Sequence, residues 1–215
     1  MGLQHIFGLF VDPKGQWGKI RDDNSSLGSF SSIHIYLLAA IPAVSGYIGT
    51  TQMGWQIGAG DPIFLTSDTA LVIAVSYYLV LLTGVFSIGW VIHLMGKAYD
   101  VVQPLSRCII LATYTATPLF LIGVMEVYPL LWLNMLIGLP ALAYTVYLLY
   151  TGLPIMMGIS RDRGFLFSTA VLGVCAYACN RGAGITGYIL WHAAFELGWS
   201  PGHPVRSTRA QILFL

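Results

Sequence analysis

The sequence contains few charged residues: Asp, Glu, Lys and Arg make up 9% of its 215 residues, and the formal net charge at pH 7 is +1. Soluble domains carry roughly 25% charged residues. A chain with so little charge cannot cover itself with a polar surface, which excludes an ordinary water-soluble domain. The balance of charge also leaves no positive field that would attract nucleic acid, so we expect no nucleic-acid partner.

Cysteines, catalytic motifs and a signal peptide are also scarce or missing. The three cysteines, Cys108, Cys175 and Cys179, lie in apolar runs, and we expect them to pack as small apolar residues rather than to bind metal. The sequence has no G-x-S-x-G, H-E-x-x-H or P-loop motif. The segment before residue 30 lacks the apolar core of a signal peptide. We therefore expect a protein that is not an enzyme and holds no cofactor or metal.

Apolar residues dominate instead, at 56% of the chain, and the mean hydropathy is +0.74. About 20 apolar residues are enough to cross the hydrocarbon core of a bilayer as a helix. No run shows the alternation that is typical of a membrane β-barrel. The sequence thus predicts an all-α, polytopic integral membrane protein in a lipid bilayer, with about five transmembrane helices. The five runs are 30–50, 68–95, 105–125, 130–153 and 164–181.

The predicted spans divide the chain into three parts. Residues 1–29 form a cytoplasmic amphipathic arm, residues 30–181 form the five-span membrane domain, and residues 182–215 form a C-terminal tail. The fifth run is interrupted by Asn180 and Arg181. We predict that the helix breaks at the segment CNRGAG and that the fifth span ends near Arg181, whose long side chain can reach the membrane surface.

Basic residues occur on one side of the predicted topology. The connections at 50–67 and 126–129 contain no Lys or Arg, whereas the arm and the other connections do. Cytoplasmic loops of inner-membrane proteins are enriched in these residues. The charge pattern therefore predicts a cytoplasmic N-terminus. The basic residues on that side are Lys14, Lys19, Arg21, Lys97, Arg107, Arg161 and Arg163.

The N-terminal arm carries a candidate docking face. Asp12 can cap a helix that begins at Pro13, and Trp17 and Ile20 follow at helical spacing on the same face. We predict that Pro13, Trp17 and Ile20 dock a partner; the alternative is a solvated arm next to the membrane. The preceding segment, Leu3–Phe10, has the pattern of a short amphipathic helix at the membrane surface.

Polar residues in spans three and four are candidates for a small polar cavity. Thr113, Tyr114 and Thr117 lie in span three, and Asn134 lies in span four. Pro118 removes the backbone hydrogen bond to the carbonyl of Tyr114, which predicts a kink. Helices that are broken by proline can line a polar cavity, as in transporters. The alternative is ordinary helix packing through small and hydroxyl residues.

A second candidate site combines His34, His93 and Arg107, which fall at the cytoplasmic ends of spans one, two and three. This combination favours an anionic lipid or quinone headgroup. Two alternatives are a haem held by the two histidines and plain polar groups at helix ends. Glu126 lies in the short turn between spans three and four, where we expect a solvated carboxylate.

Four segments carry a resemblance to a known family. They are DPKGQWGKI before span one, IPAVSGYIGTTQMGW at its end, YTATPLF in span three and AYTVYLLYTGLPIMMGI at the end of span four. In their order and spacing, residues 5–172 resemble the bacterial branch of the Yip-one domain family, relatives of the Ypt/Rab-interacting membrane proteins of eukaryotes. The resemblance implies five spans and a cytoplasmic N-terminus, and its eukaryotic trafficking role transfers by analogy alone.

Together these patterns predict a non-enzymatic scaffold or interaction protein of the bacterial inner membrane. We expect its partner to be another membrane protein or a second copy of the chain. One alternative is a small transporter or channel that uses the cavity between spans three and four. Another is an accessory subunit of a larger membrane complex. The final segment, SPGHPVRSTRAQILFL, differs from the family pattern.

Overall fold

The fold was analysed in a computed structural model, which divides the chain into two compact units, residues 1–171 and 172–215. The two pockets and the helix contacts that form them lie in the first unit. The structure describes residues 2–22, 30–54, 64–98, 101 and 103–196, and within these it describes the backbone alone for residues 2–5, 30–33, 178–179 and 181–196.

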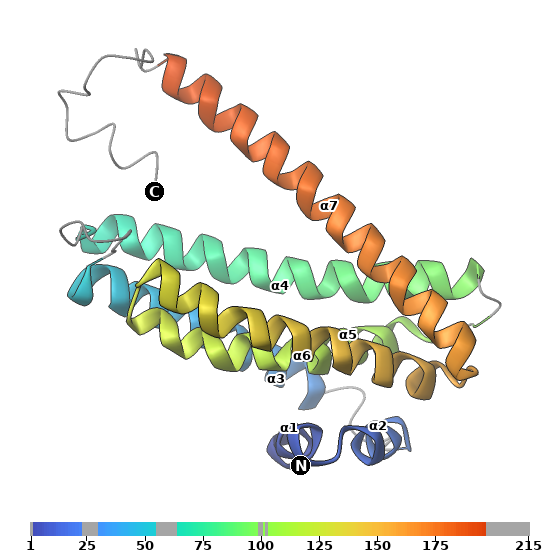
Figure 1. The fold of residues 1–215 in the computed structure, drawn as a ribbon. Helices are drawn as coiled ribbons and strands as arrows, with labels where there is room; N and C mark the ends of the chain where they lie inside the picture. Colours follow the sequence, from blue (N-terminus) through green and yellow to red (C-terminus); the bar gives the residue numbers. More distant parts are fainter. Residues whose placement is uncertain (1, 23–29, 55–63, 99–100, 102, 197–215) are drawn as a thin grey trace. The chain divides into compact units, whose positions relative to one another are not determined.

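Nearly all described residues are helical, which confirms the all-α class (Figure 1). Two short helices depart from α geometry: η1 is a π-helix and η2 is a 3-10 helix. The elements in chain order are α1 (Gly2–Val11), α2 (Pro13–Asp22), α3 (Phe30–Ile48), η1 (Gly49–Met53), α4 (Ser67–Ala98), α5 (Leu105–Ile122), η2 (Gly123–Val127), α6 (Leu131–Met157) and α7 (Arg161–Glu196).

Three helical segments in the described part of the chain are long and apolar enough to cross a membrane. They are Ser67–Ala98, Leu105–Val127 and Leu131–Met157. The second has 23 residues, which corresponds to about 35 Å at a rise of 1.5 Å per residue and exceeds the hydrocarbon core of about 30 Å. The chain is therefore an integral membrane protein. The predicted first span, 30–50, falls on α3 and the start of η1, and the predicted fifth span, 164–181, falls within the longer α7, so that five crossings stay a prediction.

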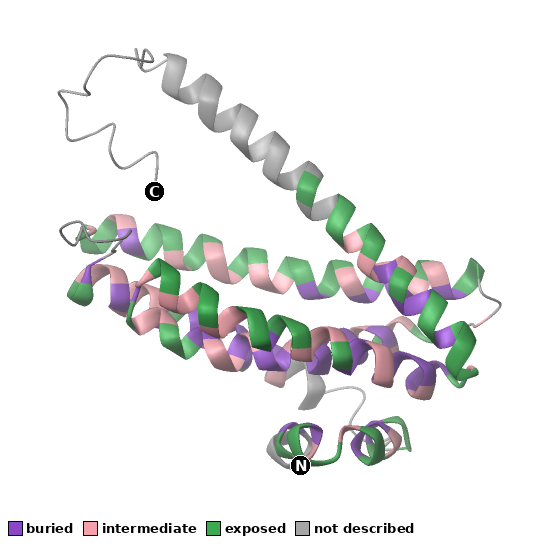
Figure 2. Cartoon of the chain, viewed as in Figure 1, coloured by how far each residue is buried: buried purple, intermediate pink, exposed green. Residues whose placement is uncertain are grey.

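Helix α5 lies at the centre of the first unit, where it packs against α3, α4 and α6. In the most apolar window of each span, 67% of the α5 residues are buried, compared with 28% in α6 and 11% in α4. Figure 2 shows the same contrast, since buried positions follow α5 while α4 is largely exposed. The core therefore forms around α5, and α4 contributes little of its surface to it.

The ends of α5 and α6 follow from local backbone chemistry. Pro104 precedes α5 in an extended conformation, with ψ at 144°, and proline is well tolerated at a helix start because no intrahelical N–H is lost there. Helix α6 ends at Gly158, which has a φ of 71° and donates its N–H to the carbonyl of Pro154. Glycine adopts this left-handed conformation without steric cost, so it terminates the helix.

The predicted break at CNRGAG is wrong, because α7 continues through Asn180 and Arg181 to Glu196. Arginine is a good helix former, and each glycine in a helix costs only about 1 kcal/mol relative to alanine. The segment contains no proline, the residue that would stop a helix. The division between membrane domain and tail at residue 181 stays a prediction, and positions 197–215 of that tail lie outside the described residues.

Candidate functional site

Two hydroxyl groups of α5, those of Thr113 and Thr117, are satisfied within their own helix, whereas the buried Thr115 hydroxyl has no hydrogen-bond partner among the described residues. Thr113 Oγ1 donates to the carbonyl of Ile109 at 2.8 Å, and Thr117 Oγ1 donates to the carbonyl of Thr113 at 3.1 Å. Both residues and Tyr114 are buried among the helices that surround α5. The bonded hydroxyls follow the pattern of helix packing more closely than that of a cavity wall.

A pocket of about 330 Å³ lies elsewhere, where α3, α4, η2 and the first turns of α6 meet. Asn134 is the residue of the predicted cavity that lines it, whereas Thr113, Tyr114 and Thr117 do not. The Asn134 side chain also donates to the carbonyl of Tyr128 at 3.3 Å, which holds the turn between η2 and α6. The lining residues are Ala43, Gly46, Tyr47, Thr50, Ile73, Ala74, Tyr77, Glu126, Pro129, Leu131 and Asn134.

The polar centre of this pocket is the pair Tyr77 and Glu126. Tyr77 Oη donates to Glu126 Oε1 at 2.9 Å, and both side chains are half-buried. A carboxyl group removed from water needs such a donor, because an unpaired buried carboxyl carries a large desolvation penalty. The expectation of a solvated loop carboxylate at Glu126 is therefore wrong: η2 packs against α3, and the carboxyl group of Glu126 reaches Tyr77 on α4.

Two glycines of the α3–η1 segment allow Glu126 to approach. A Cβ atom at Gly46 would lie 3.1 Å from Glu126 Oε2, and a Cβ atom at Gly49 would overlap the backbone carbonyl of Glu126. The second contact involves backbone atoms, which cannot rotate away as a side chain can. The position of the carboxyl group in the pocket thus depends on residue 49 being a glycine, which has no side chain.

A carboxyl group beside a phenol in a mostly apolar pocket can accept hydrogen bonds from a small polar molecule or hold a cationic group. Across the residues that the structure describes, no three His, Cys, Asp or Glu side chains lie close enough together to hold a metal ion. Cys108 is buried in α5 as a free thiol. The pocket thus offers a binding geometry in which the Glu126 carboxyl group is paired with the Tyr77 phenol.

Removing the phenol hydroxyl tests the Tyr77–Glu126 bond. We expect Tyr77→Phe to lower the free energy of unfolding by about 1.5–3 kcal/mol, the usual contribution of a hydrogen bond to a charged group. In a Glu126→Leu background the same substitution should cost little, since no carboxyl group is left unpaired. Thermal unfolding in detergent of the four proteins measures this coupling. Equal effects in both backgrounds would show that the bond contributes nothing.

The N-terminal arm is packed against the membrane helices through the residues predicted to dock a partner. Asp12 Oδ1 accepts a bond from the N–H of Gly15 at 3.1 Å and so caps α2, which begins at Pro13 as predicted. Trp17 is 0% exposed and Ile20 is 4% exposed, and Pro13 is half-buried. Trp17 and Ile20 are thus committed to contacts within the chain and present no free surface to a partner in this structure.

The contact partners of the arm lie on α5 and α6. The Trp17 indole lies edge-on to Tyr114, with ring centroids 6.5 Å apart, and fills the space where a Cβ atom of Gly152 would be. Tyr144 Oη donates to the carbonyl of Leu9 at 2.8 Å, and its ring stacks on Phe10 with centroids 5.4 Å apart. A ring on α2 and a backbone carbonyl on α1 therefore attach the whole arm to the bundle.

Two of the three residues of the second predicted site, His93 and Arg107, tie a loop to the bundle. His93 Nδ1 lies 3.0 Å from the carbonyl of Gln103, and Arg107 donates to Gln103 Oε1 at 2.8 Å. Gln103 in turn donates to the carbonyl of Met157 at 3.4 Å, at the end of α6. His34 lies on another helix, α3, and is half-buried. The structure thus brings His93 and Arg107 together through Gln103 in a structural link between α4, α5 and α6.

The Yip1 domain matches residues 7–179 of this chain. The chain belongs to the Yip1 domain family. It is 38% identical over 195 residues to inner membrane protein YohC of Escherichia coli strain K12, an alignment that covers 91% of this chain and 100% of that protein. The YohC protein of E. coli O6:H1 strain CFT073 matches with the same identity and coverage. No solved structure matches the chain.

Membership of the Yip1 family confirms the resemblance read from the four sequence segments. With an inner-membrane relative aligned along its whole length and three helices able to cross a bilayer, the protein is a multi-pass protein of the bacterial inner membrane. The matched region contains the pocket around Glu126 and the contact between Trp17 and Gly152. Both features are therefore part of the Yip1 domain of this chain.

One residue that lines the pocket of this Yip1 domain was misjudged from the sequence. Glu126 is the carboxylate between two apolar spans, and its neighbours in the chain suggest only a turn. The signal that could have indicated burial lies far away, in the pair Gly46 and Gly49 on the first span. Glycines at this spacing permit close approach of another backbone. Which backbone approaches them is decided by the tertiary fold.

Proposed function

We propose that this Yip1-family protein is a non-enzymatic scaffold that crosses the inner membrane five times, keeps its N-terminus in the cytoplasm and binds other membrane helices through α4. The observation that carries the proposal is the exposure of α4, of which only 11% of the most apolar window is buried. A span that contributes so little to its own fold is available for contacts with lipid or with another protein.

Small and hydroxyl residues on the exposed surface of α4 favour a protein partner. Ser76, Thr83 and Ser87 are exposed and recur at the spacing of one helix face, and the exposed Gly84 borders that face. Ser76 and Thr83 each donate to a carbonyl of their own helix at 2.7 Å, so neither hydroxyl needs a polar partner. Such residues let two helix backbones approach closely within a membrane.

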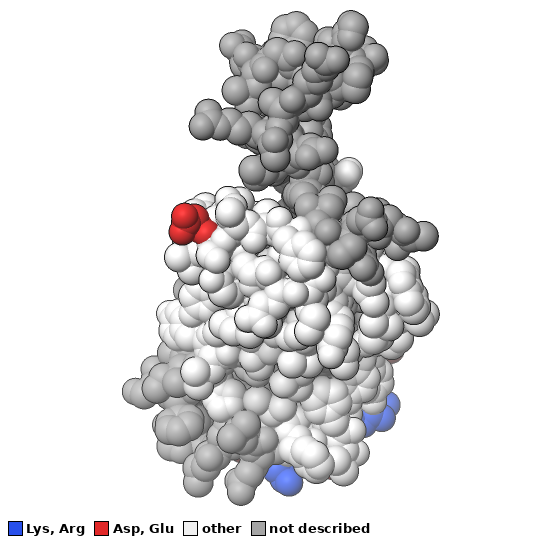
Figure 3. All heavy atoms as spheres, turned by 90° about the vertical axis from the view of Figure 1, so that its left-hand side faces the viewer, with Lys and Arg blue, Asp and Glu red and all other residues white. Residues whose placement is uncertain are grey.

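The distribution of charge supports the cytoplasmic N-terminus. Lys97 lies at the end of α4, Arg107 in the first turn of α5 and Arg161 at the start of α7, all at the end of the bundle where α2 contacts Gly152. Viewed from the opposite end, where α4 and α6 begin, most of the described surface is uncharged, with one acidic patch on it and basic groups at its lower edge (Figure 3). An excess of basic residues marks the cytoplasmic side of a membrane protein.

Transport has less support in the geometry. A channel between spans three and four would need the α5 hydroxyls to face an open path, but Thr113 and Thr117 are bonded to their own helix. The pocket around Tyr77 and Glu126 is lined by the last turns of α3 and the first turns of α4 and α6, at one end of the bundle. It is placed to hold a ligand or a turn rather than to conduct through the membrane.

A bulky residue at Gly84 tests the proposed contact. A Cβ atom there meets nothing within 4 Å, so Gly84→Leu should leave the isolated chain intact. If a partner helix packs at this point, we expect the substitution to weaken the complex by about 10-fold or more, since overpacking costs roughly 1–3 kcal/mol. The fraction of chain in complexes after mild detergent extraction, measured by native mass spectrometry, reports this change.

The matched control is Gly138→Leu on α6, where an added Cβ atom also meets nothing within 4 Å. This variant should keep the wild-type fraction of complexes. Equal losses from both variants, or no loss from Gly84→Leu, would contradict a contact through α4. A complex that contains enzyme subunits would instead support the role of accessory subunit.

A further inference from the structure

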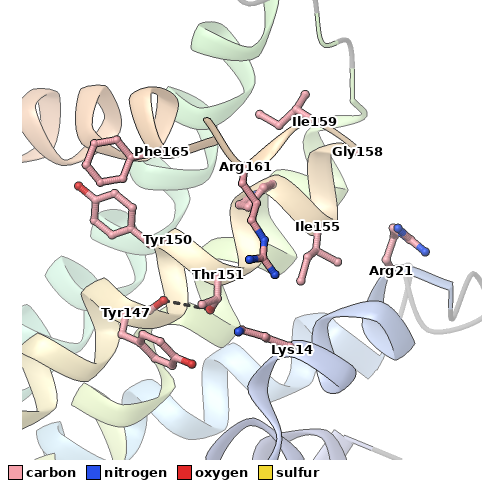
Figure 4. A pocket seen from close by; sticks show the side chains of 11 residues that line it. Lys14, Arg21, Tyr147, Tyr150, Thr151, Ile155, Gly158, Ile159, Arg161 and Phe165 are labelled. Carbon is pink, nitrogen blue, oxygen red and sulfur yellow. Dashed lines mark hydrogen bonds between the residues drawn. The ribbon is translucent and has the colours of Figure 1, made fainter. Parts of the chain in front are cut away.

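A second pocket lies beside the N-terminal arm, where α2 meets the last turns of α6 and the first turn of α7 (Figure 4). Its volume is about 630 Å³, within the range of pockets that hold small molecules or cofactors. Two parts of the chain that are far apart in the sequence form its walls: α2 and the stretch 147–165, which joins α6 to α7. None of the residues predicted as a headgroup site, His34, His93 and Arg107, lines it.

Three basic side chains line this pocket, and no carboxylate does. Lys14 and Arg21 come from α2, and Arg161 comes from α7. In Figure 4 the charged ends of Lys14 and Arg161 point toward the same space beside Thr151. Like charges that are brought together repel one another unless an anion lies between them. The fold therefore assembles a positive site from two helices.

Only one of these three cations has an acidic partner in the described part of the chain. Arg21 Nε donates to Asp22 Oδ1 at 2.9 Å, and this bond raises the pKa of Arg21. Asp22 itself does not line the pocket. Within the described residues, Lys14 and Arg161 have no ion pair with a carboxylate. Their charge is thus available to an anion from outside the chain.

The remaining walls are suited to the glycerol and acyl parts of a lipid. Tyr147, Tyr150 and Thr151 of α6 supply hydroxyl groups, and Ile155 and Phe165 supply apolar surface. Tyrosines at such positions are typical of the membrane–water interface. An inorganic phosphate ion would fill only a small part of this volume and would leave the apolar wall uncovered. The lining therefore matches a molecule with a charged end and an apolar end.

The surroundings place the pocket at the membrane surface. Helix α1, which lies against α2, exposes the apolar side chains Phe7, Phe10 and Val11 and buries Ile6 and Leu9. An amphipathic helix with such an exposed face lies in the interface of a bilayer. The basic pocket is next to this helix, at the end of the bundle that carries the Lys and Arg residues. We therefore expect its opening to lie at the level of lipid headgroups.

We propose that this pocket binds the phosphate headgroup of an anionic glycerophospholipid, with Lys14 and Arg161 as the phosphate ligands. Basic pockets between transmembrane helices on the cytoplasmic side bind lipid headgroups in this way. Arginine contacts phosphate through paired N–H groups and lysine as a point charge. Bound lipid would join α2 to α7 and so hold the arm against the bundle. The proposal does not depend on a scaffold role for α4.

Binding of short-chain phosphatidylglycerol to the purified full chain tests the proposal. We expect the double variant Lys14→Gln and Arg161→Gln to raise the dissociation constant about 30-fold, since each basic residue contributes roughly 5-fold near an anionic lipid. The control, Lys97→Gln with Arg163→Gln, removes the same charge from exposed positions at the same end that do not line the pocket. It should bind like the wild type.

Two further measurements make the result decisive. Short-chain phosphatidylcholine should bind at least about 10-fold more weakly than phosphatidylglycerol, and millimolar inorganic phosphate should not displace phosphatidylglycerol. The charge-conserving variant Lys14→Arg with Arg161→Lys should restore binding. Equal losses in the double variant and its control would overturn the proposal in favour of diffuse surface charge. Full displacement by inorganic phosphate would overturn it in favour of a site for free anions.

Discussion

Trp17→Ala is expected to release the N-terminal arm from α6 and to accelerate proteolysis within α2 by about 100-fold. The indole is fully buried against Gly152 and Tyr114. Truncating a buried Trp costs roughly 3–5 kcal/mol, and 3 kcal/mol alone raises the population of an open state by about 100-fold. Cleavage by trypsin at Lys14 or Lys19 requires this local opening of α2.

A substitution on the α6 side of this contact should also release the N-terminal arm. A Cβ atom at Gly152 would overlap the Trp17 ring, so Gly152→Val should also expose the arm. Gly138→Val on the same helix has open space around the new side chain and is the control. Mass spectrometry of N-terminal fragments after limited trypsin digestion gives the rates. If Trp17→Ala or Gly152→Val is cleaved no faster than Gly138→Val, the arm is not held by this contact.

Gly49→Ala is expected to destabilise the protein even though it replaces glycine with the best helix former. A Cβ atom there would overlap the carbonyl of Glu126 and lie 2.9 Å from the carbonyl of Val127. Forcing an extra carbon into packed backbone costs about 1–3 kcal/mol. At 2–4 °C per kcal/mol for a chain of this size, the unfolding midpoint should fall by roughly 4–8 °C for a cost of 2 kcal/mol.

The control substitution for this prediction is expected to raise the unfolding midpoint. Gly138→Ala adds a Cβ atom to α6 in open space, and glycine in a helix interior costs roughly 0.5–1 kcal/mol relative to alanine. Its midpoint should therefore rise by about 1–4 °C. Thermal unfolding of both variants in the same detergent compares them directly. A Gly49→Ala midpoint at or above that of the wild type would mean that η2 does not pack on Gly49 as the structure shows.

The long apolar runs made the middle of the fold predictable. Inside lipid, a helix has to satisfy the hydrogen bonds of its own backbone. A run that is long and apolar enough is therefore predicted to be a helix without any knowledge of the segments next to it. The runs 68–95, 105–125 and 130–153 accordingly match α4, α5 with η2, and α6. Pro104 and Gly158 mark two of the ends through local backbone conformation. The family could be inferred from short motifs and from their order along the chain, and the Yip1 domain match confirms it.

Features that depend on contacts between distant segments were not predictable in this way. The burial of Glu126 depends on Gly46 and Gly49 in another helix, and the burial of Trp17 depends on the small residue Gly152. A lone sequence does not indicate which face of one helix meets which face of another. The predicted docking surface of the arm illustrates the limit, since the apolar face was recognised while its partner proved to be the protein's own α6.

The proposed headgroup pocket also depends on contacts between distant segments and was not predictable from the sequence. Lys14 and Arg161 are far apart in the sequence, and only the fold of α2 against α6 brings them to one pocket. The sequence instead grouped His34, His93 and Arg107 by their common depth in the membrane. Depth is available from hydropathy, but lateral position around the bundle is not. His93 and Arg107 are bound to Gln103 and are used for packing.

The mass of the protein as it leaves the native membrane tests the scaffold role most directly. After extraction in a mild detergent, native mass spectrometry should find a complex that contains a second copy of the chain or another membrane protein. The complex should be lost in Gly84→Leu and kept in Gly138→Leu. A single wild-type chain that carries lipid alone, at the same abundance in all three proteins, would contradict binding through α4.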